Sequence, residues 1–213
     1  MIYMLRPGLY FRPFGNITLF FDLPRDRYFM LSGSRAQCFA RFAAGKAAAQ
    51  DIEALQREGL ILPANRQLSC EDRQAPPPTR SLVDGPLPQG TVRATIAVLK
   101  AQLLAKRDLR RHELAYVIAG LQPECPDAAS AEADICTDLA AASLRAARYL
   151  PATDECLARG IAMKRLLLTR GCPSILVFGV TIPFAAHCWI QVGDTVLTDP
   201  LDIVLHYQPI FAI

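Results

Sequence analysis

The order of apolar and polar positions divides the chain into two modules. In the first, short β-forming runs are separated by turn residues such as Gly15, Asn16 and Pro24, and apolar residues then recur at helical spacing up to Gly45 and Gly59. The predicted elements are strands at Leu9–Pro13, Ile17–Leu23 and Tyr28–Leu31, helices at Arg35–Ala44 and Ala47–Glu58, and a short strand at Leu60–Leu62. This order predicts a small winged-helix-like domain, to which we assign residues 1–68.

The pattern breaks between Ser69 and Gly90. This segment holds Pro76-Pro77-Pro78, Pro86 and Pro88 and few large apolar residues, a composition typical of an extended, partly rigid linker. Residues 69–90 are therefore predicted to connect two domains.

Helical spacing returns after the prolines. It recurs in four segments, at Val92, Ile96, Leu99 and Leu103, at Leu114, Val117, Ile118 and Leu121, over Ala131–Tyr149, and from Cys156 to Arg170. Strands follow, including a hairpin whose two-residue turn is Gly193-Asp194. The whole chain therefore predicts an α+β protein with a second domain over residues 91–213.

Composition excludes several classes of protein. The 213 residues are 52% hydrophobic and 20% charged, and the net charge of +3 is too small to indicate nucleic-acid binding. The most apolar stretch, Ile175–Val192, is interrupted by Pro183 and His187, so it indicates buried strands and no membrane span. Met1–Tyr10 lacks a secretory signal pattern, and seven cysteines without C-x-x-C spacing argue against a disulfide framework or zinc site. We expect a cytoplasmic protein with reduced thiols and no metal.

Three residues in the second domain have the types and order needed for thiol catalysis. Thr153 or Asp154 can cap a helix, which places Cys156 in its first turn, where free N–H groups and the helix dipole favour a thiolate. His187 lies in an apolar strand and can act as general base, and Asp199, at the end of the next strand, can orient its ring. The competing interpretation is a buried apolar cysteine and a core histidine satisfied by hydrogen bonds.

Other candidates for these roles are weaker. Asp194 belongs to the hairpin turn and should lie far from a mid-strand histidine, and Asp202 is a third possible carboxylate. Cys172 follows the glycine that ends its helix, where the dipole disfavours an anion. Cys188 neighbours His187 on a strand, so its side chain should point to the opposite face.

The second domain resembles the transglutaminase-like (papain-like) cysteine peptidases of lasso-peptide biosynthesis, the B proteins. The resemblance is carried by Cys156-Leu157-Ala158-Arg159-Gly160, Leu166 to Pro173, Val177-Phe178-Gly179-Val180, Ala186-His187-Cys188-Trp189-Ile190-Gln191-Val192 and Thr198-Asp199. It departs from the family pattern at Cys188 and Gln191, where Ala and Glu are common, and neither position is catalytic. The resemblance implies Cys156, His187 and Asp199 as the catalytic residues, with no cofactor.

The first domain also resembles a known family, the precursor-recognition element of ribosomal-peptide modification systems, on the run Asp22 to Ser32. This resemblance implies that the leader of a precursor peptide adds as a strand along Tyr28–Leu31, with the following helix as the other wall. The implied leader contacts are Tyr28, Phe29, Met30, Leu31, Asp51, Ile52, Leu55 and Glu58. The implied activity is hydrolysis of the leader–core bond, after which a separate ATP-dependent lasso cyclase uses the freed amine.

Three other functions stay open at this point. A transglutaminase would use the same three residues and transfer the acyl group to an amine. A winged-helix DNA-binding regulator predicts a basic recognition helix, but Ala47–Glu58 carries more acidic than basic residues. A non-catalytic scaffold that binds peptides would have no need of the intact Cys, His and Asp.

Overall fold

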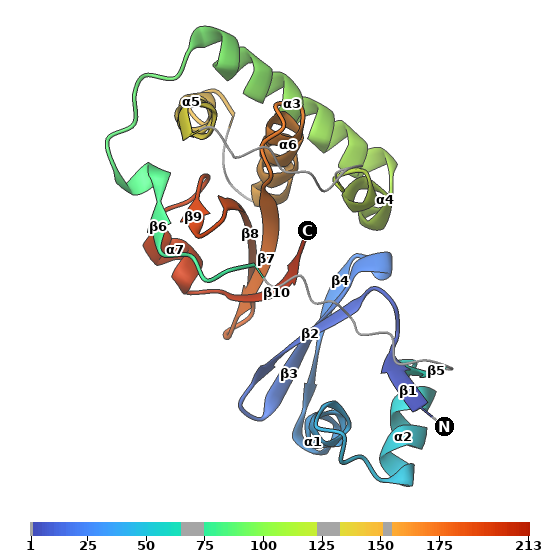
Figure 1. Cartoon of the computed structure of the whole chain (residues 1–213). Coiled ribbons are helices and arrows are strands. Elements are labelled where there is room, and N and C mark those ends of the chain that lie inside the picture. Colours follow the sequence, from blue (N-terminus) through green and yellow to red (C-terminus); the bar gives the residue numbers. More distant parts are fainter. Residues whose placement is uncertain (1, 65–74, 123–132, 151–154) are drawn as a thin grey trace. The chain divides into compact units, whose positions relative to one another are not determined.

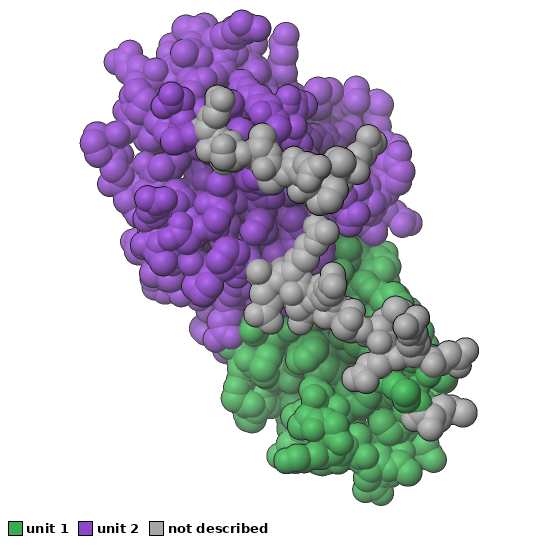
Figure 2. All heavy atoms as spheres, in the orientation of Figure 1, with its two compact units in different colours: residues 1–72 green, residues 73–213 purple. Residues whose placement is uncertain are grey.

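The chain forms two compact units, Met1–Asp72 and Arg73–Ile213 (Figure 2). The computed structural model describes residues 2–64, 75–122, 133–150 and 155–213. Helices and strands occur in both units.

The first unit contains a three-stranded sheet, a separate strand pair and two α-helices (Figure 1). Its elements are β1 (Ile2–Leu5), β2 (Leu9–Phe14), β3 (Ile17–Asp22), a 3-10 turn (Leu23–Arg25), β4 (Arg27–Ser32), α1 (Gly33–Ala43), α2 (Ala49–Arg57) and β5 (Ile61–Ala64). The sheet order is β2-β3-β4, all antiparallel, and Gly15 supplies the positive φ that the β2–β3 turn requires. The sequence prediction missed β1, which pairs antiparallel with β5.

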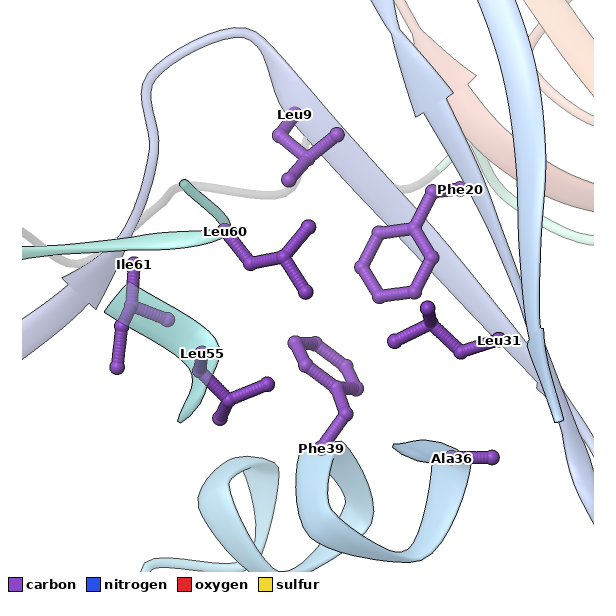
Figure 3. Close-up of a cluster of buried hydrophobic side chains, with 8 residues drawn as sticks. All are labelled: Leu9, Phe20, Leu31, Ala36, Phe39, Leu55, Leu60 and Ile61. Carbon is purple, nitrogen blue, oxygen red and sulfur yellow. The ribbon is translucent and has the colours of Figure 1, made fainter. Parts of the chain in front are cut away.

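The core of the first unit lies between the sheet and the helices (Figure 3). Phe20 of β3 meets Phe39 of α1 edge to face at 4.7 Å and stacks on Phe29 of β4 at 4.9 Å. Leu31 and Leu55 complete the contact and are almost fully buried. Each such side chain contributes about 1.5–3 kcal/mol by leaving water, so burial of this cluster stabilises the folded unit.

The second unit packs helices against a five-stranded sheet of order β10-β7-β8-β9-β6. Its elements are β6 (Arg80–Ser81), a 3-10 turn (Leu82–Asp84), α3 (Val92–Arg111), α4 (Leu114–Ala119), α5 (Ala133–Ala146), α6 (Cys156–Leu168), β7 (Ile175–Thr181), β8 (Ala185–Val192), β9 (Thr195–Val196), α7 (Leu201–Leu205) and β10 (Gln208–Ala212). Helix α6 contacts β7 and β8, and the long helix α3 crosses α5 and α6 (Figure 1). This arrangement fixes the first turn of α6 against the sheet.

Part of the predicted linker belongs to the second unit. Arg80 and Ser81 form β6, which pairs in parallel with β9 and extends the sheet. Gln191 donates to the carbonyl of Pro76, and the amide of Thr79 donates to the carbonyl of Asp194. The proline-rich composition gave no sign of this pairing, because two ladder residues are too few to form a periodic pattern.

Helix α3 occurs where it was predicted, but three of the four apolar residues that predicted it do not face the core, which Val98 does. Val92, Ile96 and Leu103 are exposed, whereas the small residues Ala94 and Ala105 are buried. Small side chains on the inner face let α3 approach α6 closely, because a helix can pack nearer where its contact residues are short.

Candidate active site

Cys156 is the first residue of α6, and Glu155 occupies the N-cap position. The predicted caps Thr153 and Asp154 lie outside the described residues. The first-turn position predicted for the thiol is what the structure shows. Unpaired backbone N–H groups and the positive end of the helix dipole lie at this position and favour a negative charge on the sulfur.

His187 of β8 and Asp199 form a hydrogen-bonded pair. The distance from Nε2 of His187 to Oδ1 of Asp199 is 3.0 Å, and the two side chains are 18% and 14% exposed. Asp199 follows the short strand β9, and its backbone carbonyl accepts a hydrogen bond of 2.7 Å from the Ser81 hydroxyl. The segment expected to be a linker therefore holds the carboxylate in place.

The imidazole of His187 also hydrogen-bonds the sulfur of Cys156. Because Nε2 already binds Asp199, Nδ1 is the ring nitrogen that faces the sulfur. Burial lowers the pKa of His187, but the bonds to Asp199 and Cys156 outweigh burial and raise it to about 9. The structure thus brings together, in the predicted order, all three residues that the sequence proposed.

The pKa of the Cys156 thiol is lowered to about 4. The largest cause is a hydrogen bond from the Cys188 side chain, followed by bonds from His187 and from the Cys188 backbone, all working against burial. With the pKa of His187 at about 9, the pair exists as thiolate and imidazolium at neutral pH. A thiolate is the reactive form of cysteine, and the imidazolium can protonate a leaving amine.

The involvement of Cys188 corrects the sequence analysis, which separated this residue from the site. Its side chain lies near Gly160 of α6, on the face opposite to that of His187 that strand alternation predicts. Cys156 begins this same helix. Cys188 is buried, and the negative Cys156 sulfur together with burial raises its own pKa well above the usual value. The sequence did show that Cys188 is adjacent to His187, but the sequence analysis took this adjacency as a reason to set Cys188 aside.

The other candidate residues lie outside this group. Asp194 is in the hairpin turn, where its carboxylate accepts from the Thr79 hydroxyl, and this bond is the main cause of its lowered pKa. Asp202 is exposed, and its carboxylate accepts from the amide of Ile203. Cys172 is buried just after α6 and contacts the carbonyl of Arg170.

The comparison with protein-family models gives one match. The model described as "Transglutaminase-like superfamily" matches residues 99–212, which is more than half of the chain. The chain belongs to the transglutaminase-like superfamily. This superfamily includes cysteine peptidases and acyltransferases, and its members are typically enzymes that use a cysteine. The match confirms the expected domain type, and no curated protein or solved structure gives a significant match.

A buried polar network supports the site in this transglutaminase-like domain. Trp189 stacks near His187 and donates from Nε1 to Oε1 of Gln191 at 2.9 Å. The amide nitrogen of Gln191 donates to the carbonyls of Pro76, at 2.8 Å, and Gly193, at 2.9 Å. Gln191 is fully buried, and its hydrogen bond to Pro76 connects the strand that carries His187 to the segment that leads into β6.

Charged groups surround the first turn of α6 in the transglutaminase-like domain. Glu155 forms an ion pair with Lys106 of α3, and both side chains are mostly buried. Arg159, one turn after Cys156, adds positive charge that acts on the Cys188 thiol, and its Nε is buried with no hydrogen-bond partner among the described residues. Glu155 offsets the charge of Lys106, so Arg159 is the cation of this group that acts on the site.

The predicted leader contacts on the edge strand β4 differ in accessibility. Met30 is exposed, Tyr28 and Phe29 are half-buried, and Leu31 is buried in the core. β4 pairs with β3 on one side, and no other described strand pairs with its second side. Asp22 of the same motif is buried and accepts a hydrogen bond of 2.7 Å from Arg6, which gives it a structural role.

The predicted contacts on α2 need correction. Asp51 is buried and accepts from both Arg41 and the amide of Ala48, and the Arg41 bond is the main cause of its lowered pKa. Leu55 packs in the core. Ile52 is half-buried, and the carboxylate of Glu58 is held by a two-bond contact with Arg35. Asp51 and Leu55 therefore stabilise the unit itself. The sequence could not show this for Asp51, because helix periodicity does not distinguish a buried polar residue from an exposed one.

The described residues contain neither a membrane-spanning helix nor a metal-binding cluster. No helix in these parts of the chain is long and apolar enough to cross a membrane. Within the same residues, no group of three or more His, Cys, Asp and Glu side chains is arranged to hold a metal ion.

Proposed function

We propose that this protein is a cysteine peptidase that removes the leader of a ribosomal precursor peptide, the leader-peptidase step of lasso-peptide maturation. The observation that carries the proposal is the Cys156–His187–Asp199 arrangement, in which a thiolate at a helix start faces an imidazolium held by a carboxylate. The accompanying unit with an open strand edge supports a peptide substrate.

Each of the three residues has one role in this reaction. The Cys156 thiolate attacks the carbonyl carbon of the scissile peptide bond, and the backbone N–H of Cys156 is suitably placed at the helix start to stabilise the oxyanion. The His187 imidazolium gives its proton to the departing amine, which leaves an acyl-enzyme. Neutral His187 then takes a proton from water, water releases the acyl group, and Asp199 keeps the ring oriented throughout.

The first unit would choose the substrate. An extended leader can add through main-chain hydrogen bonds to the edge of β4 with which no other described strand pairs, and exposed Met30 and half-buried Tyr28 would contact alternate side chains of the leader. Ile52 of α2 and Glu58, which caps its C-terminus, stay candidate contacts, whereas Asp51 and Leu55 are removed from the set by burial. The freed amine of the core would pass to a separate ATP-dependent lasso cyclase.

The test uses a ribosomal precursor peptide of the lasso type and mass spectrometry of the products. The wild-type protein should yield leader and core, and Cys156→Ala and His187→Ala should yield neither while still binding the leader in isothermal titration. Cleavage by either variant at the wild-type rate would refute the catalytic roles. Loss of leader binding in Met30→Asp, with an unchanged unfolding temperature, would support the β4 edge, and unaltered binding would count against it.

A second function, acyl transfer to an amine, is favoured by one observation, since the superfamily includes acyltransferases. Both reactions share the acyl-enzyme and differ in what releases it. Adding a primary amine to the same assay separates them, because a transferase would give the leader as an amide of that amine, heavier than the hydrolysed leader by the mass of the amine less one water.

A further inference from the structure

A second thiol lies directly beneath the first turn of α6. A Cβ atom built on Gly160 would be 3.7 Å from Sγ of Cys188. Gly160 is four residues after Cys156, so the two lie on one face of the helix, and Cα–Cβ bonds of a helix tilt toward its N-terminus. The Cys188 sulfur therefore lies under the segment that begins with Cys156.

Cys188 contacts the Cys156 sulfur with two different groups. Hydrogen bonding from its side chain and from its backbone N–H lowers the pKa of the Cys156 thiol. The position is closed to solvent, since Cys188 is only 4% exposed, and Gly160 packs tightly above it: an added Cβ would lie 2.7 Å from Cδ1 of Leu176. A buried thiol beside an anion keeps its proton, which makes Cys188 a donor and a poor competing nucleophile.

We propose that Cys188 is a positioning residue for the nucleophile: its S–H and N–H donate to the Cys156 sulfur and hold it as a thiolate facing His187. The inference rests on the proposed nucleophilic role of Cys156. One sulfur then has three hydrogen-bond donors, namely the His187 ring, the Cys188 backbone and the Cys188 thiol. A side-chain change at position 188 removes only the last of these and leaves the backbone donor in place.

The readout is the pH dependence of Cys156 alkylation by iodoacetamide, which needs no peptide substrate. Peptide mapping by mass spectrometry would assign the modified residue, and Cys156→Ala would give the blank. A hydrogen bond to an ionised group corresponds to roughly one to two pKa units. We expect Cys188→Ala to move the acid limb up by about one unit or more, which is about a tenfold slower reaction below the limb.

Cys188→Ser is the matched variant, because its hydroxyl keeps a donor of similar size. It should retain most of the wild-type acid limb, whereas Cys188→Val, which fills the space without donating, should behave like alanine. An alanine variant with the wild-type acid limb would overturn the proposal, and so would a serine variant shifted as far as valine. A uniform loss of rate at all pH values would indicate packing alone and would also overturn it.

The test is separable from that of the proposed function. If the protein does not cleave the precursor but the alkylation profile still shifts with Cys188→Ala, the leader-peptidase assignment fails and the role of Cys188 stands. If cleavage occurs and the profile does not shift, the reverse holds. Thermal unfolding of each variant confirms that the folded protein is compared.

Discussion

Changing Gln191 to Glu tests whether the proline-rich segment is part of the catalytic domain. Gln191 is fully buried, accepts from Trp189 and donates to the carbonyls of Pro76 and Gly193. Glutamate has the same shape and keeps the acceptor, but an ionised carboxylate has no proton to donate. Gln191→Glu would therefore place negative charge against two carbonyl oxygens.

The size of the effect follows from the two forms that the new side chain can take. The protonated form keeps one donor and loses one bond, worth about 1 kcal/mol. Holding it protonated at pH 7.5 costs about 4 kcal/mol, because roughly three pH units separate 7.5 from the ordinary glutamate pKa of about 4.3. The ionised form instead carries an uncompensated buried charge, worth about 3–5 kcal/mol. We expect a loss of about 3–5 kcal/mol in the free energy of unfolding at pH 7.5.

The penalty should depend on pH with a definite sign. The folded-state pKa of the carboxyl group introduced by Gln191→Glu would be raised above its unfolded value, so stability is retained below a pH of about 4.3 and is lost as the pH rises toward the folded pKa. The difference from wild type should shrink to about 1 kcal/mol near pH 4, where one hydrogen bond is still missing.

Urea unfolding followed by tryptophan fluorescence is the suitable assay. Trp189 is the sole tryptophan of the chain and hydrogen-bonds the altered residue, so the signal reports on the second unit. Gln208→Glu is the matched control, because it makes the same chemical change at an exposed position of β10. A variant at position 191 as stable as this control at pH 7.5, or a penalty that does not shrink on acidification, would refute the reasoning.

Three further predictions concern the catalytic residues and their surroundings. Activity should show a bell-shaped pH dependence with limbs near 4 and 9, because Cys156 must be ionised and His187 protonated, and a profile lacking either limb would contradict the ion pair. Asp199→Asn should lower kcat/KM by about 10²–10⁴-fold and move the basic limb downward, as steady-state kinetics across pH would show. Gly179→Ala should cost about 1–3 kcal/mol, because the added Cβ would lie 2.6 Å from the Trp189 ring, and urea unfolding that matches wild type would exclude this crowding.

The sequence predicted individual helices and strands better than it predicted which strands pair. The hairpin that begins at Ile17 and the helices near Ala36 and Leu55 were predicted within a few residues, because apolar periodicity and glycine boundaries are local signals. The first strand, β1, escaped because its pairing with β5 joins residues about sixty positions apart. Ile2 to Leu5 has no alternation that would indicate a strand by itself.

The three candidate catalytic residues could be proposed from the sequence because each one has a local signature. Cys156 precedes a helical pattern, His187 interrupts an apolar strand, and Asp199 stands before a proline that ends the next strand. Cys188 could not be assigned, because strand alternation gives the direction of a side chain and not what lies there. The helix start that fills this space depends on how α6 crosses β8, which is a tertiary property.

The preference for Asp199 over Asp194 has a physical basis that only the fold supplies. Both carboxylates lie close to the hairpin, but Asp194 is held at its tip by Thr79 and Arg80, while Ser81 binds the backbone of Asp199 two residues further along the same segment. The segment from Thr79 to Ser81 thus binds the competing carboxylate of Asp194 and anchors the backbone of Asp199, whose carboxylate faces His187. A proline-rich segment ordered by β6 loses little backbone entropy on folding, because proline already restricts the unfolded chain. The entropic cost of holding Asp199 in place is therefore smaller than it would be with a flexible loop.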